Sequence, residues 1–247
     1  MISFFKRSFF SLIKSAELVI FPSSCHLCSV LLEREGEKVV CDSCLSLLSY
    51  HRRSFCVCCG RFFGREGNPH LCGDCITKNP PFAIHRSCGS YQGNLKDVIL
   101  LYKYRKYRVL SKALAGFADR ILGNDEALWW DIDLIIPVPI DSRRKRERGF
   151  NQAELIAREL AKKKHVPCLT QTLGKAKFIP PQTSLAALER SGNVKGAFKV
   201  LKPEKIKGKT VLLVDDVFTT GATVKACSQE LIKAGVKEVR VLTIAQA

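Results

Sequence analysis

Residues 211–223, VLLVDDVFTTGAT, decide the fold, because here an apolar run meets two acidic residues and then a short Thr/Gly turn. The run 211–214 is continuously aliphatic, which is typical of a parallel strand buried on both faces. Residues 222–234 have apolar residues at helical spacing and are followed by Gly235, which favours a helix that stops there. The sequence therefore predicts a core strand ended by two carboxylates, then a turn and the start of a helix.

The chemistry of this stretch suits a sugar phosphate. A helix start offers unpaired N–H groups and the positive end of the helix dipole, so the hydroxyls and amides of residues 219–223 can hold one phosphate monoester. The carboxylates of Asp215 and Asp216 can accept hydrogen bonds from a vicinal diol, and the two features together describe a ribose 5-phosphate. The plainer interpretation is a Thr-capped helix beside two solvated aspartates, but the order of acids and Thr-Thr-Gly-x-Thr favours the sugar-phosphate site.

Composition sets the class of protein. The 247 residues are 46% hydrophobic, which is ample for a core, and no apolar run reaches the roughly 18 residues that span a bilayer. The formal net charge of +17 would attract phosphate-rich partners such as a nucleotide, a nucleic acid or an anionic membrane. Eight of the twelve cysteines form four C-x-x-C pairs, which fit a metal better than disulfides, so we expect a reducing cytoplasmic location.

The paired cysteines repeat with a period of 31 residues, and 12 residues separate the two pairs in each half. Each half supplies four thiolates, the ligand set of a structural zinc ion, so one or two ions are expected. Tandem sites are the simplest arrangement, and interleaved pairs are also allowed. Cys58, His26 and His70 are expected to be bystanders. The predicted ligands are Cys25, Cys28, Cys41, Cys44, Cys56, Cys59, Cys72 and Cys75.

Three segments are predicted along the chain. Residues 1–22 have helical apolar spacing with interspersed cations, which indicates an amphipathic helix that docks on the protein or lies on a membrane surface. Residues 23–80 form the double zinc-ribbon module, in which metal binding supplies folding free energy. The Asn-Pro-Pro sequence at 79–81 breaks the chain, so residues 81–247 form the second domain.

Further elements are expected in the second domain. Strands are predicted at 85–92, 132–140, 168–173, 197–201, 210–215 and 236–245, with 197–201 adjacent to 210–215. Residues 95–122 read as one amphipathic segment, on which basic residues including Lys103 interleave with tyrosines, a pattern that single-stranded nucleic acid binding also uses. Five cations at 143–148 are expected in a loop at a strand end, before a helix at 151–164 capped by Asn151. The polar residues 174–196 are expected to form a functional loop.

Three stretches resemble known sequences. Residues 211–223 resemble the 5-phosphoribosyl 1-pyrophosphate (PRPP) motif of type I phosphoribosyltransferases, with Phe218 where an aliphatic residue is usual. Residues 136–161, IPVPIDSRRKRERGFNQAELIARELA, resemble the signature of the ComF family, and so does the pattern Q-x2-L-x4-R-x2-N-x2-G-x-F that runs from Gln182 to Phe198.

The resemblance implies an α/β fold, with an open, mostly parallel sheet flanked by helices and a zinc-ribbon module at the N-terminus. It implies that residues 174–196 form a lid and that PRPP binds with Mg²⁺. The implied catalytic residues are Asp215, Asp216, Arg148 and Arg190. The implied PRPP-binding residues are Asp215, Asp216, Thr219, Thr220, Gly221, Ala222, Thr223, Arg146, Arg148 and Lys103.

The resemblance also implies a function linked to natural competence and DNA uptake, in which a phosphoribosyl group passes to an acceptor that the sequence does not name. The sequence leaves two alternatives to phosphoribosyl transfer open. One is a transformation factor that binds single-stranded DNA and other competence proteins without catalysis, and the other is a regulator that senses PRPP.

Overall fold

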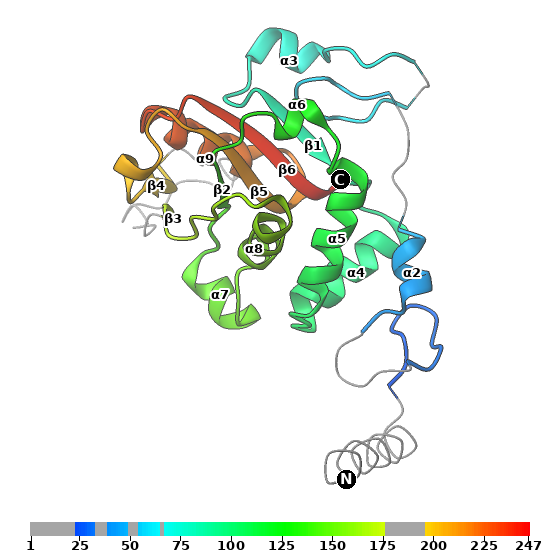
Figure 1. Ribbon diagram of the computed structural model, residues 1–247. Helices are drawn as coiled ribbons and strands as arrows, with labels where there is room; N and C mark the ends of the chain where they lie inside the picture. The colour runs from blue at the N-terminus through cyan, green and yellow to red at the C-terminus, as the bar shows by residue number, and fades with distance from the viewer. Residues whose placement is uncertain (1–22, 33–38, 49–53, 65–66, 176–195) are drawn as a thin grey trace, which may run out of the picture.

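The computed structural model describes residues 23–32, 39–48, 54–64, 67–175 and 196–247. Its centre is a parallel sheet with strand order β1-β6-β5-β2, in which β5 and β6 are the long inner strands (Figure 1). The strands are β1 (Ile84–Ser87), β2 (Leu134–Pro137), β5 (Thr210–Phe218) and β6 (Glu238–Gln246). A separate antiparallel pair joins β3 (Leu173–Lys175) and β4 (Phe198–Val200).

The sheet is covered on both faces, as its apolar strands require. Val211, Leu212, Leu213 and Val214 are each 0% exposed, which confirms a strand buried on both sides. One apolar cluster packs between the sheet and the helices α4 (Gly93–Tyr104), α5 (Leu110–Leu122) and α8 (Gln152–Lys164). The other packs under α9 (Ala222–Lys233). This confirms the predicted open parallel sheet flanked by helices.

The two cysteine-rich segments contact different parts of this core. The first, with the short helix α2 (Asp42–Ser46), contributes Leu32, Val40 and Leu48 to the α4–α5–α8 cluster. Arg120 of α5 donates to the carbonyls of Leu45 and Leu48, which fixes that segment. The second, with α3 (Gly73–Lys78), contributes to the α9 cluster and lies near β1 and β6 (Figure 1).

Several predicted elements need correction. Residues 95–122 form two helices, because the chain turns at Lys106, whose φ is 61°. The cationic run lies on a helix, α7 (Ser142–Arg148), whose N-terminus is capped by the Asp141 side chain, so the predicted loop is wrong. The strand β5 continues past the two aspartates to Phe218, paired with β6. Strand β4 pairs with β3 and lies outside the main sheet, so its predicted place beside β5 is also wrong.

Of the remaining predicted elements, one helix is confirmed, one strand is shortened, and two segments are not described. The helix capped by Asn151 is confirmed, since the Asn151 side chain accepts a hydrogen bond from the N–H of Ala153. Predicted strand 168–173 is reduced to a bridge at Cys168 and the start of β3. The remaining short elements are α6 (Glu126–Trp129) and a 3-10 turn at Pro203–Lys205. The predicted helix at 1–22 and most of the predicted lid, residues 176–195, lie outside the described residues, and the boundary near residue 80 stays a prediction.

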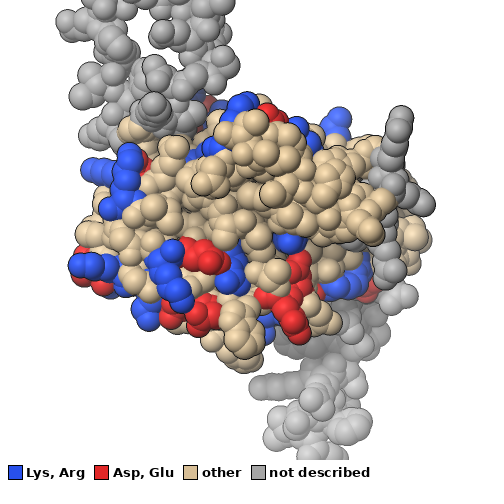
Figure 2. All heavy atoms as spheres, turned by 90° about the horizontal axis from the view of Figure 1, so that it is seen from above, with Lys and Arg blue, Asp and Glu red and all other residues tan. Residues whose placement is uncertain are grey.

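The surface carries both signs of charge. On the face shown in Figure 2, Lys and Arg side chains are interspersed with Asp and Glu around a broad area without charged groups. The excess of positive charge is therefore not gathered on that face. Within the described ranges, no helix is long and apolar enough to cross a membrane.

Candidate functional site

The turn between β5 and α9 has the geometry expected of a phosphate-binding loop. Gly221 caps α9 with a φ of 75°, a conformation that L side chains rarely adopt, and a Cβ atom there would lie 2.4 Å from the Phe218 ring. Thr219, Thr220 and Thr223 are exposed. The first N–H groups of α9 have no carbonyl partner within the helix, and only that of Ala222 makes a hydrogen bond in this turn, to the Thr220 hydroxyl at 3.4 Å. The loop therefore presents donors to solvent at the carboxyl end of the central strand.

The two aspartates lie at the same end of the sheet and differ in their surroundings. Asp216 forms an ion pair with Lys103 of α4, with 3.0 Å between Oδ1 and Nζ, and each side chain is 13% exposed. Asp215 accepts a hydrogen bond from the backbone N–H of Asp216 at 2.8 Å. The structure thus brings the end of α4 to the acidic end of β5, although these residues are far apart in the sequence.

Asp215 is an unusual carboxyl group. Desolvation by the surrounding protein, and next the negative charge of Asp216, raise the pKa of Asp215 from an ordinary value of 3.8 to about 7. The N–H of Asp216 and the charge of Lys103 oppose this rise without cancelling it. Perturbed carboxyl groups of this kind are common at functional sites.

This raised pKa predicts a pH-dependent stability. Between the ordinary and the raised pKa, the folded protein holds a proton that the unfolded chain releases, so the free energy of unfolding falls as the pH rises through that window. Asp215→Asn removes this component. Urea unfolding should therefore show the variant gaining stability relative to the wild type between about pH 5.5 and about pH 7.5. A difference that stays constant with pH would contradict the raised pKa.

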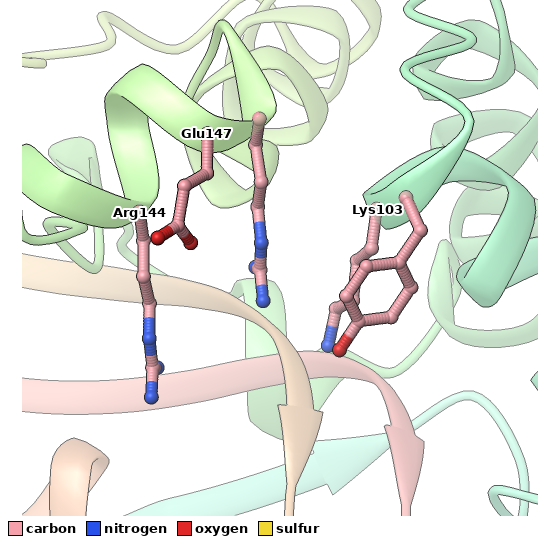
Figure 3. A pocket seen from close by; sticks show the side chains of 5 residues that line it. Lys103, Arg144 and Glu147 are labelled. Carbon is pink, nitrogen blue, oxygen red and sulfur yellow. The ribbon is translucent and has the colours of Figure 1, made fainter.

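A pocket of about 420 Å³ opens beside this ion pair, between α4 and α7. Arg144 and Glu147 extend from α7 on one side, and Lys103 extends from α4 on the other (Figure 3). Arg148 also lines the pocket, with its guanidinium 5.5 Å from the centre of the Tyr104 ring and a hydrogen bond of 3.1 Å to the Gln152 side chain. Three cations around one opening suit an anion with more than one phosphate.

The structure assembles some of the predicted site residues and separates others. Lys103 and Arg148 line the same pocket, and Lys103 connects it to Asp216. Arg146 is exposed and is not among the pocket residues, and Arg190 lies outside the described residues. Tyr104, Arg144 and Glu147 also line the pocket, although they are not among the predicted site residues. Helical spacing of the cationic run would have indicated Arg144, because residues four apart share one face of a helix.

The eight predicted metal ligands form two separate clusters in tandem. In each cluster, the four Sγ atoms lie within 4.8 Å of one another, which settles the pairing in favour of tandem sites. The Sγ atoms of Cys28 and Cys41 are 3.6 Å apart, and those of Cys59 and Cys72 are 3.7 Å apart. Tetrahedral zinc with bonds of about 2.3 Å separates its sulfur ligands by roughly 3.8 Å, so both clusters fit the ion. The clusters are Cys25, Cys28, Cys41 and Cys44, and Cys56, Cys59, Cys72 and Cys75.

Backbone groups prepare the first cysteine of each cluster for a metal. Burial acts to raise the pKa of Cys25, but hydrogen bonds from the backbone of Cys41 and Leu27 outweigh it and lower that pKa to about 6. In the second cluster, the backbone of Cys72 and Cys59 lowers the pKa of Cys56 to about 6 in the same way, against the effect of burial. A thiolate stabilised near neutral pH is the form that binds zinc.

An open parallel sheet with carboxylates and a Thr/Gly turn at the end of its central strand is the architecture of type I phosphoribosyltransferases. The phosphoribosyl transferase domain family matches residues 110–247, and the double zinc ribbon domain family matches residues 18–76. The chain therefore belongs to the phosphoribosyl transferase domain family and carries a double zinc ribbon before that domain.

Curated relatives extend over most of the chain. DNA utilization protein YhgH of Salmonella typhi is 30% identical over 226 residues, covering 91% of this chain and 97% of that protein. Competence protein F of Haemophilus influenzae is 31% identical over 180 residues, covering 71% of this chain and 78% of its own. Competence protein ComFC of Bacillus subtilis is 27% identical over 214 residues, covering 84% of this chain and 83% of that protein. With the two domain matches, these relatives show that the chain belongs to the ComF family.

Proposed function

We propose that this protein binds PRPP together with Mg²⁺ at the carboxyl end of β5 and transfers its phosphoribosyl group to an acceptor. The observation that carries the proposal is the placement of Asp216, which pairs with Lys103 between the Gly221 turn and the cationic pocket. The amides and hydroxyls of residues 219–223 hold the 5-phosphate. Asp215 and Asp216 hold the ribose hydroxyls.

The reaction breaks the bond between C1 of the ribose and the pyrophosphate oxygen, and the electron pair leaves with pyrophosphate. A nucleophile of the acceptor then forms the new bond to C1. The sugar passes through a cationic state, so the protein supplies positioning and charge stabilisation more than a nucleophile of its own. Arg148 and Arg144 stabilise the departing pyrophosphate, whereas Mg²⁺, when bound, neutralises charge on PRPP with few protein ligands.

The names of the relatives support a link between this activity and the uptake or use of DNA. Two of them are named competence proteins and one is named a DNA utilization protein, so we place this activity in the cytoplasmic processing of incoming DNA, alongside other competence proteins. The test of turnover is a pyrophosphate-release screen with PRPP, Mg²⁺ and a panel of nitrogenous acceptors, with short single-stranded DNA included. We expect release that depends on one acceptor class. Pyrophosphate release no faster than that of PRPP in buffer, for every acceptor, would refute transfer.

The arginines of α7 give a matched pair of variants. Arg148 lines the pocket, whereas Arg146 on the same helix is exposed to solvent. Arg148→Gln should weaken PRPP binding by about tenfold, because it removes a charged partner of the pyrophosphate. Arg146→Gln should leave the affinity within about twofold, since Arg146 does not line the pocket. Calorimetric titration measures both, and equal losses in the two variants would contradict the assignment of the pocket.

A second function is favoured by the surface of α4. Tyr104 is 65% exposed and is followed by Arg105 and Lys106, which are exposed as well. An accessible ring beside cations suits single-stranded DNA, whose bases stack while its phosphates pair with the cations. Binding of an oligonucleotide that weakens steeply as salt is raised would support this function. Binding of PRPP without turnover would instead support a regulator that senses PRPP.

A further inference from the structure

His85 of β1 is enclosed between the second cysteine cluster and the main sheet. Its side chain is 0% exposed. Its Nδ1 lies 2.7 Å from the carbonyl oxygen of Cys59, and its Nε2 lies 2.8 Å from the hydroxyl of Thr243 on β6. Because a carbonyl oxygen only accepts, Nδ1 carries the proton, and Nε2 accepts from Thr243. The ring is thus fixed at both nitrogens, with a predicted zinc ligand on one side.

The flat face of the same ring supports the phosphate-binding loop. The His85 and Phe218 rings are stacked, with their centroids 4.1 Å apart and an angle of 16° between their planes. Phe218 is the last residue of β5, and its ring leaves no room for a Cβ atom at Gly221. The position of the Phe218 ring therefore determines where the chain turns into α9.

Backbone contacts hold the cysteine-rich segment against β1 at this point. The N–H of His85 donates to the carbonyl of Cys58 at 2.7 Å. A Cβ atom at Gly60 would lie 2.5 Å from the His85 carbonyl oxygen, so only a glycine lets the two backbones approach this closely. In addition, Thr243 is the register partner of Asp215 across the β5–β6 ladder. His85 therefore contacts Phe218, which adjoins the phosphate-binding loop, and Thr243, which pairs with Asp215 at the proposed diol site.

We propose that His85 is a positioning residue that couples the second cysteine cluster to the phosphate-binding loop. The cluster fixes the Cys59 carbonyl, this carbonyl and Thr243 fix the imidazole, and the imidazole fixes Phe218 and so the Gly221 turn. The coupling explains why residue 218 is aromatic, where an aliphatic residue is usual, since an aliphatic side chain has no flat face to stack on His85. The inference rests on the proposed function only for the identity of the ligand, PRPP.

The test uses two variants that break the stack from opposite sides. His85→Leu removes both hydrogen bonds and the flat face but keeps most of the volume, and Phe218→Leu removes the other ring and leaves the histidine bonds intact. The matched control is His70→Leu. His70 belongs to the same cysteine-rich segment and stacks on Phe63 in similar geometry, 4.3 Å and 17°, but on an exposed site.

The primary readout is amide hydrogen exchange at the first hydrogen-bonded turn of α9, which the loop leads into, without ligand. It is measured by mass spectrometry on full-length protein whose zinc content has been determined. We expect exchange at residues 225–228, which begin with the Lys225 N–H that donates to the Gly221 carbonyl at 2.8 Å, to rise at least about tenfold in His85→Leu and Phe218→Leu, with zinc retained. Exchange there should stay at the wild-type rate in His70→Leu. The affinity for PRPP should fall about tenfold in the same two variants.

The outcomes separate the two proposals. If the exchange of residues 225–228 in both stack variants matches the wild type, the coupling is refuted, and if one variant does not fold, the other decides. Loosening of residues 225–228 in His70→Leu to the same extent would also overturn it, because the effect would then be a general response of the cysteine-rich segment. If the exchange rises as expected but wild-type protein does not bind PRPP, the coupling stands and the proposed function fails.

Discussion

Asp216→Asn should weaken the binding of Mg²⁺ and PRPP by about 100-fold in a calorimetric titration. The carboxylate is proposed to accept hydrogen bonds from the ribose hydroxyls, and an amide of the same shape replaces one acceptor oxygen with a donor. The substitution also leaves Lys103, which is only 13% exposed, without its charge partner. The variant therefore loses both a ligand contact and the group that positions the neighbouring cation.

A second aspartate provides the control for this experiment. Asp133 lies at the opposite, amino end of the strands, where it pairs with Lys209 at 3.1 Å and accepts from the N–H of Thr210. Asp133→Asn makes the same chemical change to a carboxylate that pairs with lysine, far from the proposed ligand. It should leave the affinity for PRPP unchanged. An Asp216→Asn protein that binds PRPP as well as the wild type would contradict the proposal that Asp216 holds the ribose hydroxyls.

The largest effect on stability is expected at the second cysteine cluster. Cys59→Ser should remove one zinc ion per chain and expose the cysteine-rich segment to proteolysis, because a structural zinc site contributes on the order of 10 kcal/mol to folding. The Sγ of Cys59 lies 3.7 Å from that of Cys72 within the cluster, and its carbonyl holds His85. Zinc analysis of the purified protein gives the stoichiometry, and limited proteolysis reports the loss of structure.

Cys58 is the matched control, since it is the immediate neighbour of Cys59 and lies outside the four-sulfur cluster. Cys58→Ser should keep two zinc ions and resist proteolysis as the wild type does. Loss of zinc in Cys58→Ser, or a full complement of zinc in Cys59→Ser, would show that the ligand set is wrong. The same logic predicts that Cys28→Ser empties the first cluster alone, because no cysteine is shared between the two.

Local patterns in the sequence were enough to predict the central part of the fold. Residues 211–214 form a continuous aliphatic run. Such a run is typical of a parallel strand that is covered on both faces, and the run alone therefore predicts the burial. The 31-residue repeat of C-x-x-C pairs predicted four-sulfur zinc sites, because each half supplies four thiolates, but it left open whether the pairs combine in tandem or interleave and whether one or two ions bind. The cap at Asn151 was predictable for a similar reason, since its side chain bonds a backbone group only two residues away.

Most of the features that were missed depend on distant contacts. Spacing does not reveal that Lys103 meets Asp216, because this pair forms only when α4 packs against the carboxyl end of the sheet. Strand β4 pairs with β3 instead of β5, and a three-residue strand has too little pattern to specify its partner. The α7 helix was mistaken for a loop because its seven polar residues have no apolar stripe. The stacking of Phe218 on His85 is also a contact between strands that are distant in the sequence, so spacing does not reveal it.

The measurement that tests the central claim most directly is a crystal structure of the protein with Mg²⁺ and PRPP. We predict the 5-phosphate at the amides of residues 219–223, the ribose hydroxyls at Asp215 and Asp216, and the pyrophosphate directed toward Arg148. PRPP bound elsewhere on the chain, or electron density that leaves this turn empty at saturating ligand, would contradict the proposal that the end of β5 is a sugar-phosphate site.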